Sequence, residues 1–599
     1  MRGSGSISSN NELISYHTFI FPFEFEGTGH EKTFRDIIEN AQSSNWKHSG
    51  LFNINIPNKG GASGKIPNYN EYNYFNEQAR DILYESEKKC ENCTSNCIDN
   101  GASVCFNKSE SFFFEKNPKN YEYIIKKTIK KENPEEIINY EYSLKVDDIT
   151  LRIFKHNIGI LSFHLENYKY KSIDDILRIN QYGRRIYPPF LVYDKDQNLS
   201  ISIPELASSI SIDDISCDFG GYNNISTDNI TQTQLKFLTE ILGNAFNDFK
   251  ITSLVDDRMF VVCWYGNDEL SNRLNTCDET KKEFVFESDD KWYEMLFVDN
   301  PGGCSCQNEV MKRDLIKKYT YTRWTNYSTF FGISRYSFIC LTNDLNTLRR
   351  NNAEFIVNHM RTIYYQMIVI SFVQRISILK FKKRIGNAIE KYLGKENISN
   401  NVNEDDKFNE ELEKIQEDYL EFINRICLRE ITPQEQGIEL YNMMRGSMEI
   451  DESSKALKEE ISEIFNLSVY KDKKRQKLRD DGEKERAEKL NDVMNAIAVI
   501  SGVLGISSLL SAFMDFNTKD FRAISFILIF MALTYFLAYM SWKNINKNKN
   551  FELSKIFKDR VLIIIVISMI LITILYLLLV SDNISIDDLY EKITQIINQ

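Results

Sequence analysis

Three segments of the chain carry arginines beside aromatic side chains, and they are the first candidates for chemistry. They read NQYGRRIYPPF, DDRMFVV and YTRWTNYSTFFGISRY, and their candidate ligand-binding residues are Arg184, Arg185, Arg258, Arg323, Trp324 and Arg335. A guanidinium is a planar fork that fits phosphate or carboxylate, and an aromatic ring offers a stacking face to a base. Converging in one cleft, these residues would bind a small anionic nucleotide. The alternative is local pairing of each arginine with a carboxylate such as Asp256 or Asp257.

A cluster of four cysteines is the second candidate site. It comprises Cys90, Cys93, Cys97 and Cys105. Four thiolates so close in sequence can satisfy the tetrahedral geometry of Zn²⁺, and a reducing cytosol disfavours disulfides. The spacing is not that of a common paired zinc knuckle. Both a structural zinc site and free or oxidisable thiols therefore stay open.

Catalytic motifs are not evident in the sequence. The six histidines are scattered singly, without a His-x-x-Glu-His pair or a nucleophile elbow. We therefore expect a protein that is not an enzyme.

The stretch 491–516, NDVMNAIAVISGVLGISSLLSAFMDF, holds about twenty residues without a charge, enough for a helix to cross roughly 30 Å of hydrocarbon. Small and hydroxyl residues on one face of a helix suit either a narrow passage or close packing inside a bundle. On the first interpretation, one face lines a pore with Met494, Ile497, Ser501, Leu504, Ser508, Ser511 and Asp515.

Two further apolar runs and a long charged segment surround this stretch. The run 521–542 follows after so short a link that the two would form an antiparallel hairpin. A heptad-like, proline-free segment from about Glu449 predicts a stalk helix, and about sixty residues give a rod of roughly 90 to 100 Å. The third run, 561–580, either spans the membrane or lies along the bundle or interface.

This arrangement of stalk, first membrane helix, tight outer loop and second helix resembles the CorA family of magnesium channels. The family's Gly-Met-Asn signature, usually YGMNF, has its counterpart here in AFMDF at 512–516. The filter-equivalent residues are then Phe513, Met514 and Asp515. The resemblance implies a homopentamer whose first membrane helices line the pore, with Asn491 and Met494 at its inner entrance.

The change from Asn to Asp515 has a chemical consequence under this resemblance. In the family, a ring of neutral amide carbonyls holds hydrated Mg²⁺, which loses its water reluctantly. Five carboxylates would attract several kinds of cation, so Mg²⁺ or another cation would occupy the pore. The alternative is that Asp515 only faces the outer headgroup region.

The segments YGRRIYPP and DDRMFVVCWY are similar to those of divergent CorA-like proteins associated with type III CRISPR systems. That similarity implies an antiviral effector that compromises the membrane on binding a nucleotide messenger, a conjugate of S-adenosylmethionine and AMP. Two other functions stay open. One is a divalent-cation (Mg²⁺) transporter with an altered filter, and the other is a membrane-anchored sensor that conducts nothing.

The length of the chain and its charge distribution predict its domain count, its partners and its location. At 599 residues several domains are expected, and a net charge of −12 disfavours direct nucleic-acid binding. Lysine and arginine concentrate at 471–489 and 543–560, which the positive-inside rule places in the cytoplasm. We expect a bacterial inner-membrane protein with a cytoplasmic N-terminal domain. The expected partners are other copies of the chain, the lipid bilayer and a small nucleotide.

The expected fold class is a cytosolic α+β (α/β) domain, then a helical stalk and C-terminal transmembrane helices in a CorA-like funnel. The expected divisions are a tag-like leader (1–7), a sensor domain (8–345), a helical bundle and stalk (350–490), a pore hairpin (491–542), a basic loop (543–560), a third membrane helix (561–580) and an acidic tail (581–599).

Local patterns predict the elements of the sensor domain and bundle. Strands are expected at 17–27, 258–266 and 334–342, and a hairpin at 149–168. Helices are expected at 232–249, 355–385 and 408–428. The apolar helix at 355–385 should not span a membrane, because Arg361, Gln366, Gln374 and Arg375 interrupt it.

Overall fold

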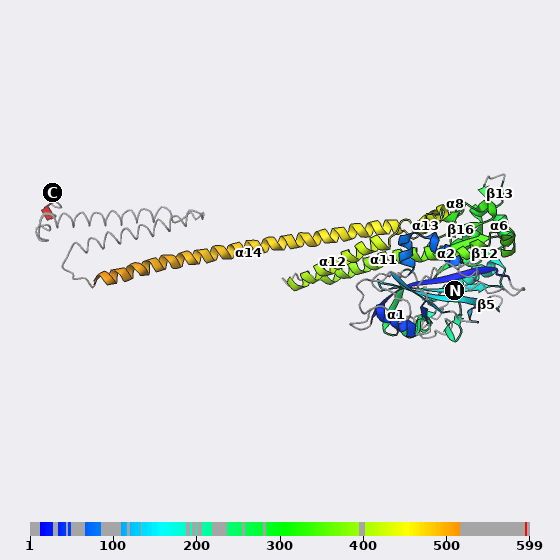
Figure 1. Cartoon of the computed structure of the whole chain (residues 1–599), viewed down its shortest axis with the longest axis horizontal. Coiled ribbons are helices and arrows are strands. Elements are labelled where there is room, and N and C mark those ends of the chain that lie inside the picture. The colour runs from blue at the N-terminus through cyan, green and yellow to red at the C-terminus, as the bar shows by residue number, and fades with distance from the viewer. Residues whose placement is uncertain are drawn as a thin grey trace. The chain divides into compact units, whose positions relative to one another are not determined.

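The computed structural model describes residues 12–27, 34–43, 46–48, 66–84, 110–116, 120–132, 135–186, 192–193, 199–200, 206–218, 237–253, 255, 258–278, 283–393, 402–514 and 594–595 (Figure 1). Contacts divide the chain into two compact units, Met1–Asn466 and Leu467–Gln599. The helices that follow the sheet as far as Asn466 therefore share one compact unit with it.

A large mixed sheet forms the centre of the first unit. Among the described residues it has 13 strands, in the order β10-β9-β4-β5-β6-β1-β12-β17-β16-β15, with β11 beside β1 and β2 paired through β3 to β5. Its pairs are antiparallel except β12 with β17, which run parallel. The strands are β1 (Ser15–Gly27), β2 (Lys47–His48), β3 (Ser111–Lys116), β4 (Glu122–Glu132), β5 (Glu135–Phe154), β6 (Ile158–Asn167), β9 (Ser209–Ile212), β10 (Ile215–Asp218), β11 (Phe249–Ser253), β12 (Phe260–Gly266), β15 (Thr320–Tyr321), β16 (Phe330–Ile333) and β17 (Ser337–Thr342).

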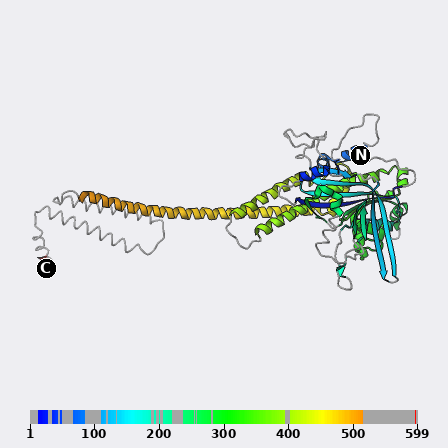
Figure 2. The ribbon, with the colours of Figure 1, turned by 90° about the horizontal axis from the view of Figure 1, so that it is seen from below.

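Two short antiparallel pairs lie outside this sheet. They are β7 (Val192–Tyr193) with β8 (Leu199–Ser200), and β13 (Cys277–Asp278) with β14 (Glu283–Phe284). In Figure 2 the long hairpin of β4 and β5 stands out from the rest of the first unit.

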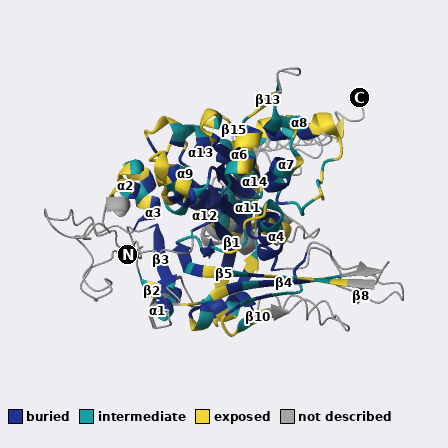
Figure 3. Ribbon diagram, turned by 90° about the vertical axis from the view of Figure 1, so that its right-hand side faces the viewer, coloured by how far each residue is buried: buried dark blue, intermediate teal, exposed yellow. Residues whose placement is uncertain are grey.

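The strand β1 shows why the sheet is buried on both faces. Successive side chains of a strand point to opposite faces, so residues two apart share a face. Phe19 and Phe21 pack in one apolar core, whereas Tyr16 and Ile20 pack in the other. In Figure 3 buried residues gather along β1 and along the helices that cover the sheet.

Helices cover both faces. Helices α1, α4 and α7 contribute buried side chains to the core with Phe19, and α3, α10, α11, α12 and α13 to the core with Tyr16. The helices are α1 (Phe34–Ser43), α2 (Ile66–Tyr74), α3 (Glu77–Leu83), α4 (Ile173–Gly183), α6 (Asp268–Leu274), α7 (Asp290–Phe297), α8 (Glu309–Tyr319), α9 (Leu345–Arg350), α10 (Phe355–Arg361), α11 (Ile363–Leu393), α12 (Val402–Arg425), α13 (Glu435–Ser447) and α14 (Ile450–Met514), with 3₁₀ turns at Gly243–Phe246, Val285–Ser288 and Thr325–Tyr327.

The structure confirms an α+β fold and the predicted strands. The hairpin turns at Asn157, which has a positive φ of 56°, and β5 begins earlier than expected, at Glu135. Two helix predictions need correction. Residues 237–242 are helical, but Phe249 already begins strand β11, because it packs among the phenylalanines of the sheet. The predicted helix 355–385 is two helices, α10 and α11, which meet at Thr362.

Helix α11 is the apolar centre of the bundle. Within the described part of the chain, one helical segment, 355–391, is apolar and long enough to cross a membrane, and 83% of its most apolar window is buried. The sheet and helix α12 pack against α11. Four residues of α12 at helical spacing, Leu412, Ile415, Tyr419 and Phe422, lie in the shared core. A core helix is therefore the interpretation that its surroundings support.

Helix α14 begins at Ile450, where the stalk was predicted, and continues without a break through Gly482 to Met514. The charged stalk and most of the first apolar run thus form one 65-residue helix. Asp515 and the runs 521–542 and 561–580 lie outside the described residues, so the membrane hairpin, the third helix and the funnel stay predictions.

Candidate functional site

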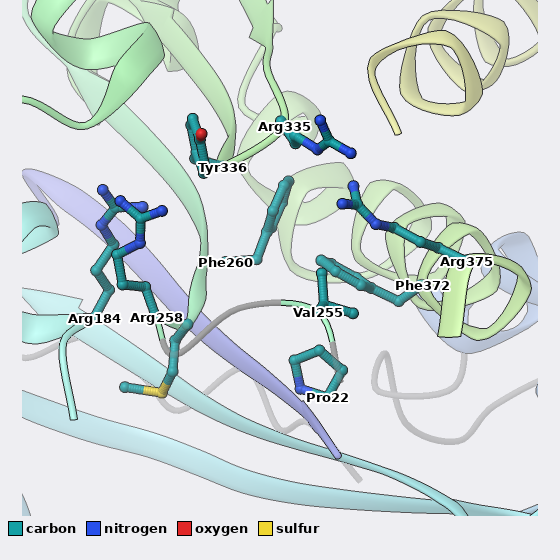
Figure 4. A pocket seen from close by; sticks show the side chains of 10 residues that line it. Pro22, Arg184, Val255, Arg258, Phe260, Arg335, Tyr336, Phe372 and Arg375 are labelled. Carbon is teal, nitrogen blue, oxygen red and sulfur yellow. The ribbon is translucent and has the colours of Figure 1, made fainter. Parts of the chain in front are cut away.

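A pocket of about 290 Å³ lies in the first unit, where the end of α4, strand β12, the β16–β17 turn and helix α11 meet (Figure 4). Four of the described residues that line it are arginines, and none of that set is acidic. On a chain with a net charge of −12, this lining concentrates positive charge. The lining residues are Pro22, Arg184, Val255, Arg258, Met259, Phe260, Arg335, Tyr336, Phe372 and Arg375.

The end of helix α4 places Arg184 in the pocket. Gly183 lets the helix end approach the sheet closely, since an added Cβ would lie 2.7 Å from Phe19 and 2.9 Å from Ile125. The Tyr123 hydroxyl donates to the Gly183 carbonyl oxygen at 2.7 Å. The next residue, Arg184, is consequently only 2% exposed.

Neutral oxygen atoms orient the Arg184 guanidinium. Its Nη2 lies 3.2 Å from Gln181 Oε1 and 3.5 Å from the Val298 carbonyl oxygen. Val298 caps helix α7 in the left-handed conformation (φ 57°, ψ 48°), which is rare for a β-branched residue and indicates strain that the surrounding packing holds in place. These two neutral acceptors orient the guanidinium at this end of the pocket.

Arg258 joins Arg184 through backbone and ring contacts. The Met259 amide donates to the Arg184 carbonyl oxygen at 2.8 Å, and Arg185 forms an antiparallel bridge with Arg258. The Tyr336 ring is shared by both guanidiniums, whose central carbons lie 4.9 Å (Arg258) and 5.7 Å (Arg184) from its centroid. Cation–π attraction therefore holds the two arginines on one side of the pocket.

Arg335 and Arg375 lie on the opposite side of the pocket in Figure 4. Arg335 is in the turn between β16 and β17, and Arg375 projects from helix α11. Arg335 Nη2 lies 3.4 Å from Glu449 Oε2, with the two side chains 45% and 58% exposed. A half-exposed ion pair of this kind contributes little and exchanges readily.

Apolar side chains separate the two arginine pairs. The Phe260 and Phe372 rings meet edge to face, with centroids 5.0 Å apart and planes at 81°. They offer dispersion contacts to a base or another flat group, while the flanking guanidiniums can donate hydrogen bonds to phosphate or carboxylate oxygens. The chemistry of the pocket therefore fits an organic anion.

The structure brings together three of the six predicted ligand residues, Arg184, Arg258 and Arg335. Arg185 contributes its backbone bridge beside them and is 6% exposed. The other two predicted residues, Arg323 and Trp324, are not among the pocket residues.

Arg323 pairs with carboxylates, but these lie far away in the sequence, on helix α13, and not in the local segment that the alternative named. Its Nη2 lies 3.0 Å from Glu435 Oε2 and its Nη1 lies 2.8 Å from Glu439 Oε2. Trp324 packs beside Tyr327 on the surface, with ring centroids 6.1 Å apart.

The prediction did not include the seven other described lining residues, which are Pro22, Val255, Met259, Phe260, Tyr336, Phe372 and Arg375. Arg375 had a signal, because it is one of four polar residues that interrupt the apolar helix predicted at 355–385. Tyr336 directly follows Arg335, and Phe260 lies two positions after Arg258. Nothing local pointed to Phe372, which resembles every other apolar residue of helix α11.

Cys90, Cys93, Cys97 and Cys105, the candidate zinc ligands, lie outside the described residues, so a zinc site and free thiols both stay open. Within the described ranges, no group of three or more His, Cys, Asp or Glu side chains could hold a metal ion. The partly buried Cys304 and Cys306 are free thiols, and burial raises the pKa of Cys304 to about 12.

The predicted pore residues from Asn491 to Ser511 lie on helix α14, whereas Asp515 lies outside the described residues. The side chains of Asn491, Met494, Ile497 and Ser501 are exposed in the second unit. Leu504, Ser508, Ser511, Phe513 and Met514 continue the same helical backbone.

Comparison with known proteins gives no match to a family model, a curated protein or a solved structure. The CorA-like resemblance and the function it implies therefore stay predictions.

Proposed function

We propose that this chain is a CorA-like membrane channel whose N-terminal unit binds a nucleotide messenger and thereby opens a poorly selective pore as an antiviral, type III CRISPR effector. The observation that carries the ligand half of the proposal is the four-arginine pocket with its phenylalanine contacts. A conjugate of S-adenosylmethionine and AMP is the ligand that the sequence resemblance suggests.

Two features of the pocket support an anionic nucleotide. Guanidiniums on opposite sides can each contact an anionic group, and the Phe260 and Phe372 rings between them can contact a base. The four arginines gather positive charge in one cavity of a chain whose net charge is −12, which favours an anionic ligand. The cavity, of about 290 Å³, can hold one part of such a ligand.

The exposed residues of helix α14 support assembly in a membrane. Leu490, Val493, Met494 and Ile497 are between 55% and 67% exposed. They recur at three- and four-residue intervals, which places them on one side of the helix. Copies of the same helix around a pore axis, or lipid, would cover this apolar side.

Gating is proposed as a population shift. The ligand favours the open state only by its difference in affinity between the open and closed states. The apolar residues Met494, Ile497 and Leu504 can close a pore by dewetting when the helices approach one another. The stalk part of α14 connects the ligand-binding unit to these residues within one continuous helix.

Ligand binding is tested by calorimetry on the full-length chain in lipid nanodiscs, with AMP and the S-adenosylmethionine–AMP conjugate as probes. Arg375→Gln should weaken binding by about 10- to 100-fold, because one charge-assisted contact contributes about 1.5–3 kcal/mol. Arg384→Gln is the matched control. Arg384 lies on the same helix α11, but pairs with Asp418 at 2.6 Å.

The channel half is tested by ion flux from liposomes that contain the full-length chain. The conjugate should start the release of monovalent and divalent cations, and Arg375→Gln should abolish release at the same ligand concentration. Binding without flux would favour the non-conducting sensor. Growth rescue of a magnesium-requiring strain without any ligand would instead favour the transporter.

A further inference from the structure

The pocket and the start of the stalk helix share a side chain, Arg335. It lies at the tip of the β16–β17 turn, which Ser334 holds through its hydroxyl, 3.0 Å from the Ser337 hydroxyl and 3.1 Å from the Tyr336 amide. This turn is therefore rigid, and it directs Tyr336 to the Arg184 side of the pocket. Arg335, next to it, lines the pocket and also pairs with Glu449.

Two residues, Met448 and Glu449, separate α13 from α14, and Glu449 has a positive φ of 54°. Its carbonyl oxygen accepts from the Ser453 amide at 3.0 Å, so it closes the first turn of α14. A non-glycine residue tolerates positive φ only when neighbouring contacts hold it there. The ion pair with Arg335 is one contact of the Glu449 side chain.

The residues on either side of Glu449, at the junction of α13 and α14, are held in the core by other contacts. Met448 is 2% exposed and Ile450 is fully buried. Arg445 donates to Asp451 in the first turn of α14 and, at 2.8 Å, to Gln374 Oε1 on helix α11. The side chain of Gln374 thus contacts Arg445 beside the α13–α14 junction, while the next residue, Arg375, lines the pocket.

We propose that Arg335 is the coupling residue: a phosphate bound in the pocket takes the Arg335 guanidinium from Glu449 and so loosens the first turn of α14. This inference rests on the proposed function. A phosphate monoester carries more charge than one carboxylate and accepts two parallel hydrogen bonds from one guanidinium. The existing pair is half exposed, so exchange to the phosphate is favourable.

Linkage requires the coupling to act in both directions. Breaking the pair from the Glu449 side should free Arg335 for the ligand and tighten ligand binding. We therefore expect Glu449→Gln to lower the Kd for AMP about two- to tenfold in the full-length chain. Glu354→Gln, which breaks the similarly exposed Arg349–Glu354 pair (44% and 56%), is the control and should leave the Kd unchanged.

A double-mutant cycle distinguishes competition between Glu449 and the ligand for Arg335 from a general electrostatic effect on the Kd. In the Arg335→Gln background, Glu449→Gln should no longer change the Kd. If the double variant still gains the same affinity, loss of a nearby negative charge explains the gain, and the coupling is wrong.

Hydrogen–deuterium exchange gives a second readout at residues 446–455. AMP should raise amide exchange at these residues in the wild-type chain. The Glu449→Gln variant should show raised amide exchange there without AMP. If AMP binds and Arg375→Gln weakens it, but exchange and the Glu449→Gln affinity do not change, the coupling is wrong and the pocket stands. If neither AMP nor the S-adenosylmethionine–AMP conjugate binds the wild-type chain, the pocket assignment and the coupling are both wrong.

Discussion

Arg258 lies over the ring of Tyr336, with the guanidinium carbon 4.9 Å from the ring centroid. Arg258 lies two residues before β12, and Tyr336 lies in the β16–β17 turn, directly before β17. The contact therefore depends on the parallel pairing of β12 with β17. The ring organises one side of the pocket, because Arg184 contacts it as well.

Replacing this ring should weaken anion binding. We expect Tyr336→Leu to raise the Kd for AMP about 3- to 30-fold, since a cation–π contact contributes about 0.5–2 kcal/mol. Tyr336→Phe keeps the ring and should stay within about threefold of wild type. Calorimetry on the full-length chain measures both, and equal affinities for the two variants would contradict an orienting role for the ring.

Arg445 should matter for stability. It is 2% exposed and donates to the Leu428 carbonyl oxygen at 2.6 Å and to Gln374 at 2.8 Å. Arg445→Met removes the charged donor to the buried Gln374 Oε1, whereas the Leu428 carbonyl oxygen keeps bonds from Tyr441 and Gln374. We therefore expect the free energy of unfolding to fall by about 2–4 kcal/mol. Urea denaturation followed by tryptophan fluorescence measures the change.

A surface arginine provides the comparison. Arg323→Gln breaks exposed pairs with Glu435 and Glu439 and should cost less than about 1 kcal/mol. Equal losses for the Arg323 and Arg445 variants would show that burial does not determine the cost.

Acid should destabilise the first unit through His17. Burial lowers the pKa of His17 to about 4, and the neutral ring can donate from Nδ1 to Asn180 and accept at Nε2 from Ser15. The unfolded chain, with a histidine pKa near 6.5, binds the proton first as the pH falls. The stability is therefore complete above about pH 6.5 and is lost progressively toward pH 4.

The expected loss from this residue between pH 7 and pH 5 is roughly 2 kcal/mol. Urea denaturation at the two pH values measures it. His17→Gln should be less stable at pH 7 but should depend less on pH in this window. A variant with the wild-type pH dependence would show that other groups cause the loss.

Asp515 tests the proposed filter, although it lies outside the described residues. Under the channel proposal, Asp515→Asn restores the neutral amide of the CorA signature, and we expect the permeability of monovalent cations relative to Mg²⁺ to fall several-fold. Reversal potentials in planar bilayers measure this ratio, with Asp520→Asn as the control. Unchanged selectivity in an active channel would exclude a filter role for Asp515.

Local sequence patterns predicted the central strands and the long helices. Alternating side chains predicted β1, short apolar runs predicted β12 and β17, and the start of the stalk helix was predicted within one residue. Each of these patterns depends on near neighbours in the chain. The α+β class followed from them. The error at Phe249 arose because an apolar residue at helical spacing packs equally well in a strand.

The composition of the pocket could be predicted only in part. The sequence identified arginines beside aromatic residues, but Arg184 and Arg323 looked equally suitable there. Strand pairing decided between them: it brought Arg184 to Arg258 and Tyr336, whereas helix α13 brought carboxylates to Arg323.

The sequence by itself determined the central strands, the long helices and where charge and apolar residues concentrate. Only the tertiary structure decided that Arg375 faces the pocket and that Arg335 reaches Glu449. The physical reason is that both contacts join residues separated by dozens to more than a hundred positions. Such contacts depend on how the helices pack on the sheet, which no local periodicity specifies.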